Sequence, residues 1–136
     1  MTREFGRHKG RLLIVDDDMD ILTTFKTGLE QQGYFADAYQ DPMKALENFR
    51  PGQYDLLLVD IHMPKMDGFR FFQEAQKIDS RAKACFITAY DAHMKAFREI
   101  FPDLDIGCYI KKPIAMIDLA EQIRLNLLHE NSEHGR

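Results

Sequence analysis

The stretch that most constrains the fold runs from Tyr54 to Gly68 and reads YDLLLVDIHMPKMDG. Near its start, Leu56 to Val59 are four consecutive apolar residues without polar alternation. Such a short, uniform run is typical of a strand buried on both faces, as in a parallel sheet covered by helices. The run ends at Asp60, and loop residues follow. Open α/β sheets bind ligands at the carboxyl ends of their strands, so Asp60 stands at a place suited to chemistry, although alone it could equally begin a turn.

Strand-like and helix-like segments alternate along the whole chain, which favours an α/β fold with a parallel sheet. Five strands are predicted, over residues 11–15, 34–39, 56–60, 83–88 and 106–110. Five helices are predicted, over residues 19–32, 42–50, 69–78, 91–101 and 115–129. Asp41 and Pro42 give the second helix an N-cap and a first residue, and Gly33 is expected to end the first helix. The second strand is the most polar, which suits the edge of the sheet.

The length of 136 residues and the 45% hydrophobic content predict one domain with its own core. We expect a flexible basic arm over residues 1–10, the domain over 11–129 and a polar tail over 130–136. The net charge of −4 gives no reason to expect nucleic-acid binding by this domain. No apolar run approaches the roughly 18 residues of a membrane span, and no signal peptide is apparent. Cys85 and Cys108 are therefore interpreted as buried thiols of a cytoplasmic protein, and the strands that carry them could be adjacent.

Polar side chains follow four of the five predicted strands: Asp16 and Asp17, Asp60, Thr88, and Lys112. Right-handed crossovers bring the carboxyl ends of all strands to one edge of the sheet, so these groups should converge. Three clustered carboxylates need a cation, and a set of oxygen ligands suits Mg²⁺. A hydroxyl and an ammonium group can hold phosphoryl oxygens, and a central carboxylate can act as the nucleophile. The pattern indicates phosphoryl transfer to Asp60.

Each of these residues also has an ordinary explanation. Aspartates before a helix are favoured by capping and by the helix dipole, and we assign the N-cap of the first helix to Asp18. A threonine at a strand end, a surface lysine and an Asp-Gly turn at Asp67 and Gly68 are common on their own. What these explanations leave open is why all the groups meet at one edge.

In four segments the sequence resembles the receiver domain of two-component response regulators. They are LLIVDDD over 12–18, DIHMPKMDG over 60–68, the threonine after the fourth strand, and YIKKP over 109–113. The similarity covers Arg11 to Leu128, and the second segment is highly specific. The resemblance implies a single doubly wound, five-stranded sheet of flavodoxin-like order 2-1-3-4-5 with helices on both faces.

The resemblance also implies roles for the site residues. Asp60 would be the phosphoacceptor, and Mg²⁺ would be held by Asp16, Asp17, Asp60 and the backbone carbonyl of His62. Lys112 would bind the phosphoryl group, and the bond from Lys112 to Pro113 would be cis.

Further residues are implied to take part in switching. Thr88 would bind the phosphoryl group, and the rotamer of Tyr109 would follow Thr88. His62 and Tyr90 each stand two residues past a site residue, where the family tunes the lifetime of the phosphoryl group. Both are bulky here.

The function implied is a signalling switch that promotes only its own phosphorylation and dephosphorylation, and not an enzyme acting on other substrates. The donor would be a sensor histidine kinase or a phosphotransfer protein, and the downstream partner is unknown. Phosphorylation could also drive dimerisation through the fourth helix, fifth strand and fifth helix.

Two alternatives remain. A phosphatase of the haloacid dehalogenase type also forms an aspartyl phosphate, but it needs a second acid where this chain has His62, and usually a cap domain. A receiver-like binding module that is never phosphorylated would not need the complete set of site residues.

Overall fold

The computed structural model describes residues 8–89, 99 and 108–134, with side chains as far as Leu128. Three predicted parts lie outside the described residues. They are the fourth helix over 91–101 except for residue 99, the lifetime-tuning candidate Tyr90, and the first seven residues of the arm. Within the described part of the chain, no helix is long and apolar enough to cross a membrane.

The described strands form one parallel sheet of order β2-β1-β3-β4-β5. They are β1 (Arg11–Val15), β2 (Phe35–Tyr39), β3 (Leu56–Asp60), β4 (Ala84–Thr88) and β5 (Cys108–Lys111). The predicted order is confirmed, and so are the edge position of β2 and the central, fully buried position of β3. β3 is buried along its whole length because it has a strand on each side and helices on both faces.

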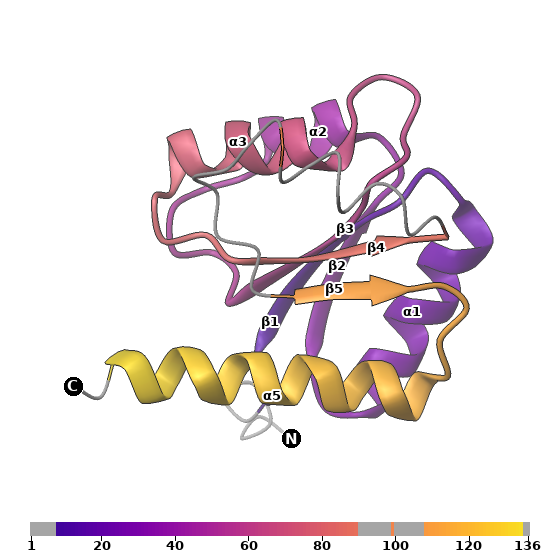
Figure 1. The fold of residues 1–136 in the computed structure, drawn as a ribbon, viewed down its shortest axis with the longest axis vertical. Helices are drawn as coiled ribbons and strands as arrows, with labels where there is room; N and C mark the ends of the chain where they lie inside the picture. Colours follow the sequence, from indigo (N-terminus) through magenta and orange to yellow (C-terminus); the bar gives the residue numbers. More distant parts are fainter. Residues whose placement is uncertain (1–7, 90–98, 100–107, 135–136) are drawn as a thin grey trace.

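The described helices are α1 (Met19–Gln31), α2 (Pro42–Glu47), α3 (Gly68–Ile78) and α5 (Met116–His134). Figure 1 shows α2 and α3 on one face of the sheet and α1 and α5 on the other. Successive strand residues point to opposite faces, so β1 supplies both cores. Leu12 and Ile14 pack with α1 and α5, whereas Leu13 and Val15 pack with α2 and α3.

The helix ends follow the local sequence signals. The side chain of Asp18 accepts hydrogen bonds from the backbone N–H groups of Asp20 and Ile21, which confirms it as the N-cap of α1. Asp41 caps α2, with Pro42 at the first helical position. Gly33 follows α1 with a φ of +103°, a left-handed conformation that favours glycine.

Two predicted helix ends are wrong by three residues or more. α2 ends at Glu47 instead of residue 50. The backbone N–H of Arg50 donates to Gln53 Oε1 at 2.9 Å instead of continuing the helix, and Pro51 disfavours a helical residue before it. α5 continues to His134, five residues past the predicted end. The polar residues from 130 to 134 therefore continue the helix instead of ending it.

The interpretation of the two cysteines as free thiols is also wrong. Cys85 and Cys108 stand directly opposite each other on β4 and β5 and form a disulfide. Both cysteines are buried and lie on neighbouring strands, as the sequence suggested. The pairing depends on the register of two strands 23 positions apart, which residue spacing does not determine.

Candidate functional site

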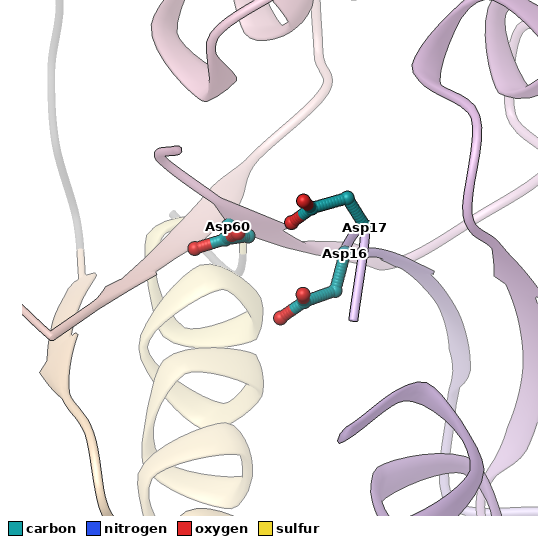
Figure 2. Close-up of side chains that lie close together, drawn as sticks. All are labelled: Asp16, Asp17 and Asp60. Atoms are coloured by element: carbon teal, nitrogen blue, oxygen red, sulfur yellow. The ribbon is translucent and has the colours of Figure 1, made fainter. Parts of the chain in front are cut away.

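Three aspartates meet where β1 and β3 end. Asp60 is the last residue of β3, while Asp16 and Asp17 directly follow β1 (Figure 2). One carboxylate oxygen from each lies within 4.8 Å of the others. Asp16 is 2% exposed and Asp60 is 5% exposed, so two of these acids are almost removed from solvent. β1 and β3 are adjacent and parallel, and that pairing brings together residues 44 positions apart in sequence.

Lys112 reaches into this acidic cluster from the end of β5. Its Nζ lies 3.0 Å from Asp16 Oδ2 and 3.5 Å from Asp60 Oδ1. Asp16 also accepts a hydrogen bond from the backbone N–H of Asp18 at 2.9 Å. The Lys112 ammonium group therefore contacts two of the three carboxylates, and within the described residues the cluster keeps an excess of negative charge.

The buried charges perturb one another. Burial raises the pKa of Asp60 to about 7, and the neighbouring Asp16 charge adds to this effect, although Lys112 opposes it. Burial likewise raises the pKa of Asp16, against the hydrogen bonds from Asp18 and Lys112. Burial disfavours the charged form of Lys112, but the contacts with Asp16 and Asp60 outweigh it and raise the pKa of Lys112. Protons and cations are therefore bound more readily here than at exposed aspartates.

The ends of β4 and β5 complete the edge. Thr88 is fully buried at the end of β4, and its backbone carbonyl accepts a hydrogen bond from the backbone N–H of Lys112 at 2.8 Å. Tyr109 lies on β5, partly buried against the core formed with α2 and α3. The His62 side chain is exposed just past β3. The peptide bond between Lys112 and Pro113 is cis.

Gly68 helps to build the site, although the sequence indicated only a turn at this residue. A Cβ at this position would collide with the backbone carbonyl oxygen of Asp60 and lie 3.0 Å from the Cα of Ile61. The Gly68 N–H donates to the Ile61 carbonyl at 2.9 Å, and Asp67 caps α3. The first turn of α3 thus rests directly on the backbone of Asp60. A glycine just inside a helix start, where its helix propensity is poor, was the signal available in the sequence.

Gln40 is a second contributor that the sequence did not reveal. Its side-chain amide donates to the backbone carbonyl of Asp17 at 2.9 Å and so ties the loop after β2 to the loop after β1. A cavity of about 330 Å³ opens beside Asp17, lined by Asp17, Gln40, Asp41, Pro42, Pro64 and Lys65. The loops around the acidic cluster therefore leave room for a small molecule or for part of a partner.

The acidic cluster fits a divalent cation. Its donors are carboxylate oxygens from Asp16, Asp17 and Asp60, close enough together to share one ion. An all-oxygen set with few protein carboxylates is what Mg²⁺ takes when water and phosphate oxygens fill its remaining positions. In the part of the chain that the structure describes, the three carboxylates outnumber the ammonium group of Lys112, and this excess of negative charge also favours a bound cation.

Comparisons with known proteins agree with this geometry. The family model for the response regulator receiver domain matches residues 12–124. The transcriptional regulatory protein RprY of Bacteroides fragilis is 33% identical over 118 residues, which cover 85% of this chain and 48% of RprY. The chain spans about half the length of the first curated relatives it matches.

Two solved structures are also similar to this chain. A CheY-like receiver domain protein from Methanospirillum hungatei is 31% identical, with a TM-score of 0.76, and the match covers 90% of this chain and 97% of that one. The response regulator protein TrrA from Thermotoga maritima, solved in complex with Mg²⁺ and BeF, is 30% identical with a TM-score of 0.71. That match covers 85% of this chain and 97% of TrrA.

Proposed function

The chain belongs to the response regulator receiver domain family, and on that premise we propose that it is a switch phosphorylated on Asp60. The donor is a sensor histidine kinase or a phosphotransfer protein, and the proposed compartment is the cytoplasm. The observation that carries the proposal is the position of Asp60, at the end of the central strand, among two further carboxylates and 3.5 Å from Lys112. A haloacid dehalogenase assignment is excluded by the family match.

The proposed reaction transfers a phosphoryl group between two nucleophiles. A carboxylate oxygen of Asp60 forms a bond to phosphorus as the phosphorus–nitrogen bond of a phosphohistidine breaks, and the departing imidazole takes up a proton. Positioning and charge neutralisation are the main needs of such a step. Lys112 supports both, because its ammonium group already lies between Asp16 and Asp60.

In this proposal Asp16, Asp17, Asp60 and the backbone carbonyl of His62 hold Mg²⁺. The bound ion would supply the positive charge that lets phosphoryl oxygens approach three carboxylates. Asp17 belongs to the loop that directly follows β1. The Gln40 bond to the Asp17 carbonyl supports the position of that loop.

Switching would follow from a change of contacts at the ends of β4 and β5. The Thr88 hydroxyl would move to a phosphoryl oxygen, and the ring of Tyr109 would take the space released. A group that contacts the two states differently shifts their populations. His62 and Tyr90 would set how long the phosphoryl group survives by controlling the access of water.

The proposed output surface includes β5 and α5, together with the predicted fourth helix. Three large apolar side chains on α5 are exposed: Ile117 at 74%, Leu125 at 46% and Leu128 at 51%. An exposed apolar set of this kind supports contact with a downstream partner or with a second phosphorylated copy.

We expect treatment with acetyl phosphate and Mg²⁺ to add one phosphoryl group to this chain, and Asp60→Asn to abolish the addition. The reason is that Asp60 is the only one of the three clustered acids at the end of the central strand. Intact mass spectrometry measures the gain directly. Asp20→Asn, in the first turn of α1, is the matched control and should be phosphorylated like the parent. A gain that persists in Asp60→Asn would place the acceptor elsewhere, and no gain in the parent would favour an unphosphorylated binding module.

Lys112→Ala is expected to slow phosphorylation of Asp60 by on the order of 100-fold, because a preorganised charged donor is lost from the reacting groups. Lys111→Ala changes the neighbouring exposed residue of β5 and should have less than about a threefold effect. The rate can be followed by quenched-flow mass spectrometry with acetyl phosphate in excess. Equal rates in the two variants would show that the ammonium group of Lys112 does not act on the phosphoryl group.

A further inference from the structure

The Cys85–Cys108 pair lies outside the acidic cluster and has no part in the proposed phosphoryl transfer. Cys85 is the second residue of β4 and Cys108 is the first residue of β5. The two are directly paired in the parallel register, with Cα atoms 4.4 Å apart. Both side chains belong to the core between the sheet and helices α1 and α5. Two sulfur atoms are thus held together by the fold itself.

The two cysteines differ in their access to solvent. Cys85 is fully buried, whereas Cys108 retains 7% of its surface. Cys108 is therefore the less completely buried of the two cysteines, and its sulfur is taken as the first to react with a reagent from solution. The sulfur of Cys85 needs no contact with solvent, because it reacts with the sulfur of Cys108 directly opposite it.

From this arrangement we infer that Cys85 and Cys108 form a reversible thiol–disulfide modification site, oxidised by low-molecular-weight disulfides. The Cys108 thiolate attacks one sulfur of such a disulfide, breaks its S–S bond and releases one thiolate. The Cys85 thiolate then attacks the Cys108 sulfur in the mixed disulfide and releases the second. The two protein thiols are oxidised by two electrons, and their two protons end on the two released small thiols.

The position of the disulfide decides what oxidation does to the fold. It joins β4 to β5 three residues before Thr88 and one residue before Tyr109. A crosslink removes conformations in which the joined strands are apart, both in the unfolded chain and in locally opened states. Oxidation should therefore hold together the two strands that carry Thr88 and Tyr109. This input needs neither a phosphoryl group nor Mg²⁺, so it goes beyond the proposed function.

The test begins with a titration of the full chain in mixtures of oxidised and reduced glutathione. Each sample is denatured and alkylated before its intact mass is measured. We expect one transition, from a protein that takes up two alkyl groups to one that takes up none and is about 2 Da lighter, reversed by dithiothreitol. Cys108→Ala should show no such transition. Two alkylated thiols throughout, glutathione adducts as the only products, or a disulfide that dithiothreitol does not reduce in the folded protein would each overturn the inference.

The consequence for the fold is measured on the same sequence in its two redox forms. The oxidised form should melt about 10 °C above the reduced form, since the bond closes a loop between residues 23 positions apart. Amide exchange at Phe86, Ile87, Tyr109 and Ile110 should slow at least about tenfold on oxidation.

Cys85→Ala and Cys108→Ala are the controls, and each should have the same melting temperature under oxidising and reducing conditions. Each variant is compared only with itself, so a loss of stability caused by the substitution does not affect the result. Equal melting and exchange in the two forms of the parent would overturn the proposed effect on β4 and β5. These readouts use no phosphodonor, so they succeed or fail independently of phosphorylation at Asp60.

Discussion

Replacing Gly68 by alanine should destabilise the fold by about 3 kcal/mol and slow phosphorylation of Asp60 by on the order of 100-fold. The added methyl group would meet the carbonyl oxygen of Asp60, the Asp60 carbonyl carbon at 3.0 Å and the Cα of Ile61 at 3.0 Å. All three are backbone atoms of the buried central strand or the residue after it, so no flexible side chain can move aside. Either α3 shifts away from β3, or Asp60 itself moves. Both outcomes loosen the site.

Gly52→Ala is the matched control for this substitution. Gly52 has a φ of +73° and nothing within 4 Å of the added Cβ, so alanine there carries backbone strain without a collision. Strain of this kind costs about 1 kcal/mol, and it lies far from the chemistry. Urea unfolding measures both stabilities, and acetyl phosphate labelling measures both rates. If the two variants lose equal stability and keep equal rates, contact between α3 and the backbone of Asp60 does not build the site.

The second large effect is expected from the proton affinity of Asp60. An unfolded aspartate has a pKa near 3.8, and burial raises the pKa of Asp60 to about 7 in the folded protein. Below pH 4 Asp60 is protonated in both the folded and the unfolded state, so it does not lower the free energy of unfolding. Between about pH 4 and 7 the unfolded chain releases the proton and the folded chain keeps it, so the free energy of unfolding falls as pH rises. Above pH 7 the free energy of unfolding stays lowered by the full effect of Asp60, which has an upper limit of about 4 kcal/mol.

Asp60→Asn should therefore be more stable than the parent at neutral pH, and the difference should shrink to near zero by pH 4. Thermal melts of both proteins from pH 4 to 8, without divalent cations, measure this difference. Asp118→Asn, in the exposed first turn of α5, is the control and should keep the falling profile of the parent. Saturating Mg²⁺ should restore parent stability at neutral pH by about 2–3 kcal/mol, with a smaller gain in Asp60→Asn. A parent profile that rises between pH 4 and 7 would show that Asp60 is not a source of repulsion in the folded state.

Much of the molecule follows from the sequence alone. The unbroken apolar run before Asp60 predicted a strand buried on both faces, and the structure places β3 at the centre of the sheet. Alternating strand and helix patterns predicted an α/β fold, and Asp18, Asp41 and Gly33 marked helix ends through local capping. These features depend on neighbours along the chain, so the sequence contains all the information they need. The convergence of Asp16, Asp17, Asp60 and Lys112 was also predictable, because parallel strands share one carboxyl edge.

The tertiary structure alone decided the features that depend on distances between segments far apart in sequence. The Cys85–Cys108 bond required the register of β4 against β5, which a shift of one residue would have destroyed. The close approach of Gly68 to Asp60 required the path of the loop between β3 and α3. The raised pKa of Asp60 required the depth of burial, since a carboxylate loses hydration only when helices and loops close over it. Sequence patterns specify which face of an element is apolar, but packing between elements sets the separations on which repulsion, collision and covalent bonding depend.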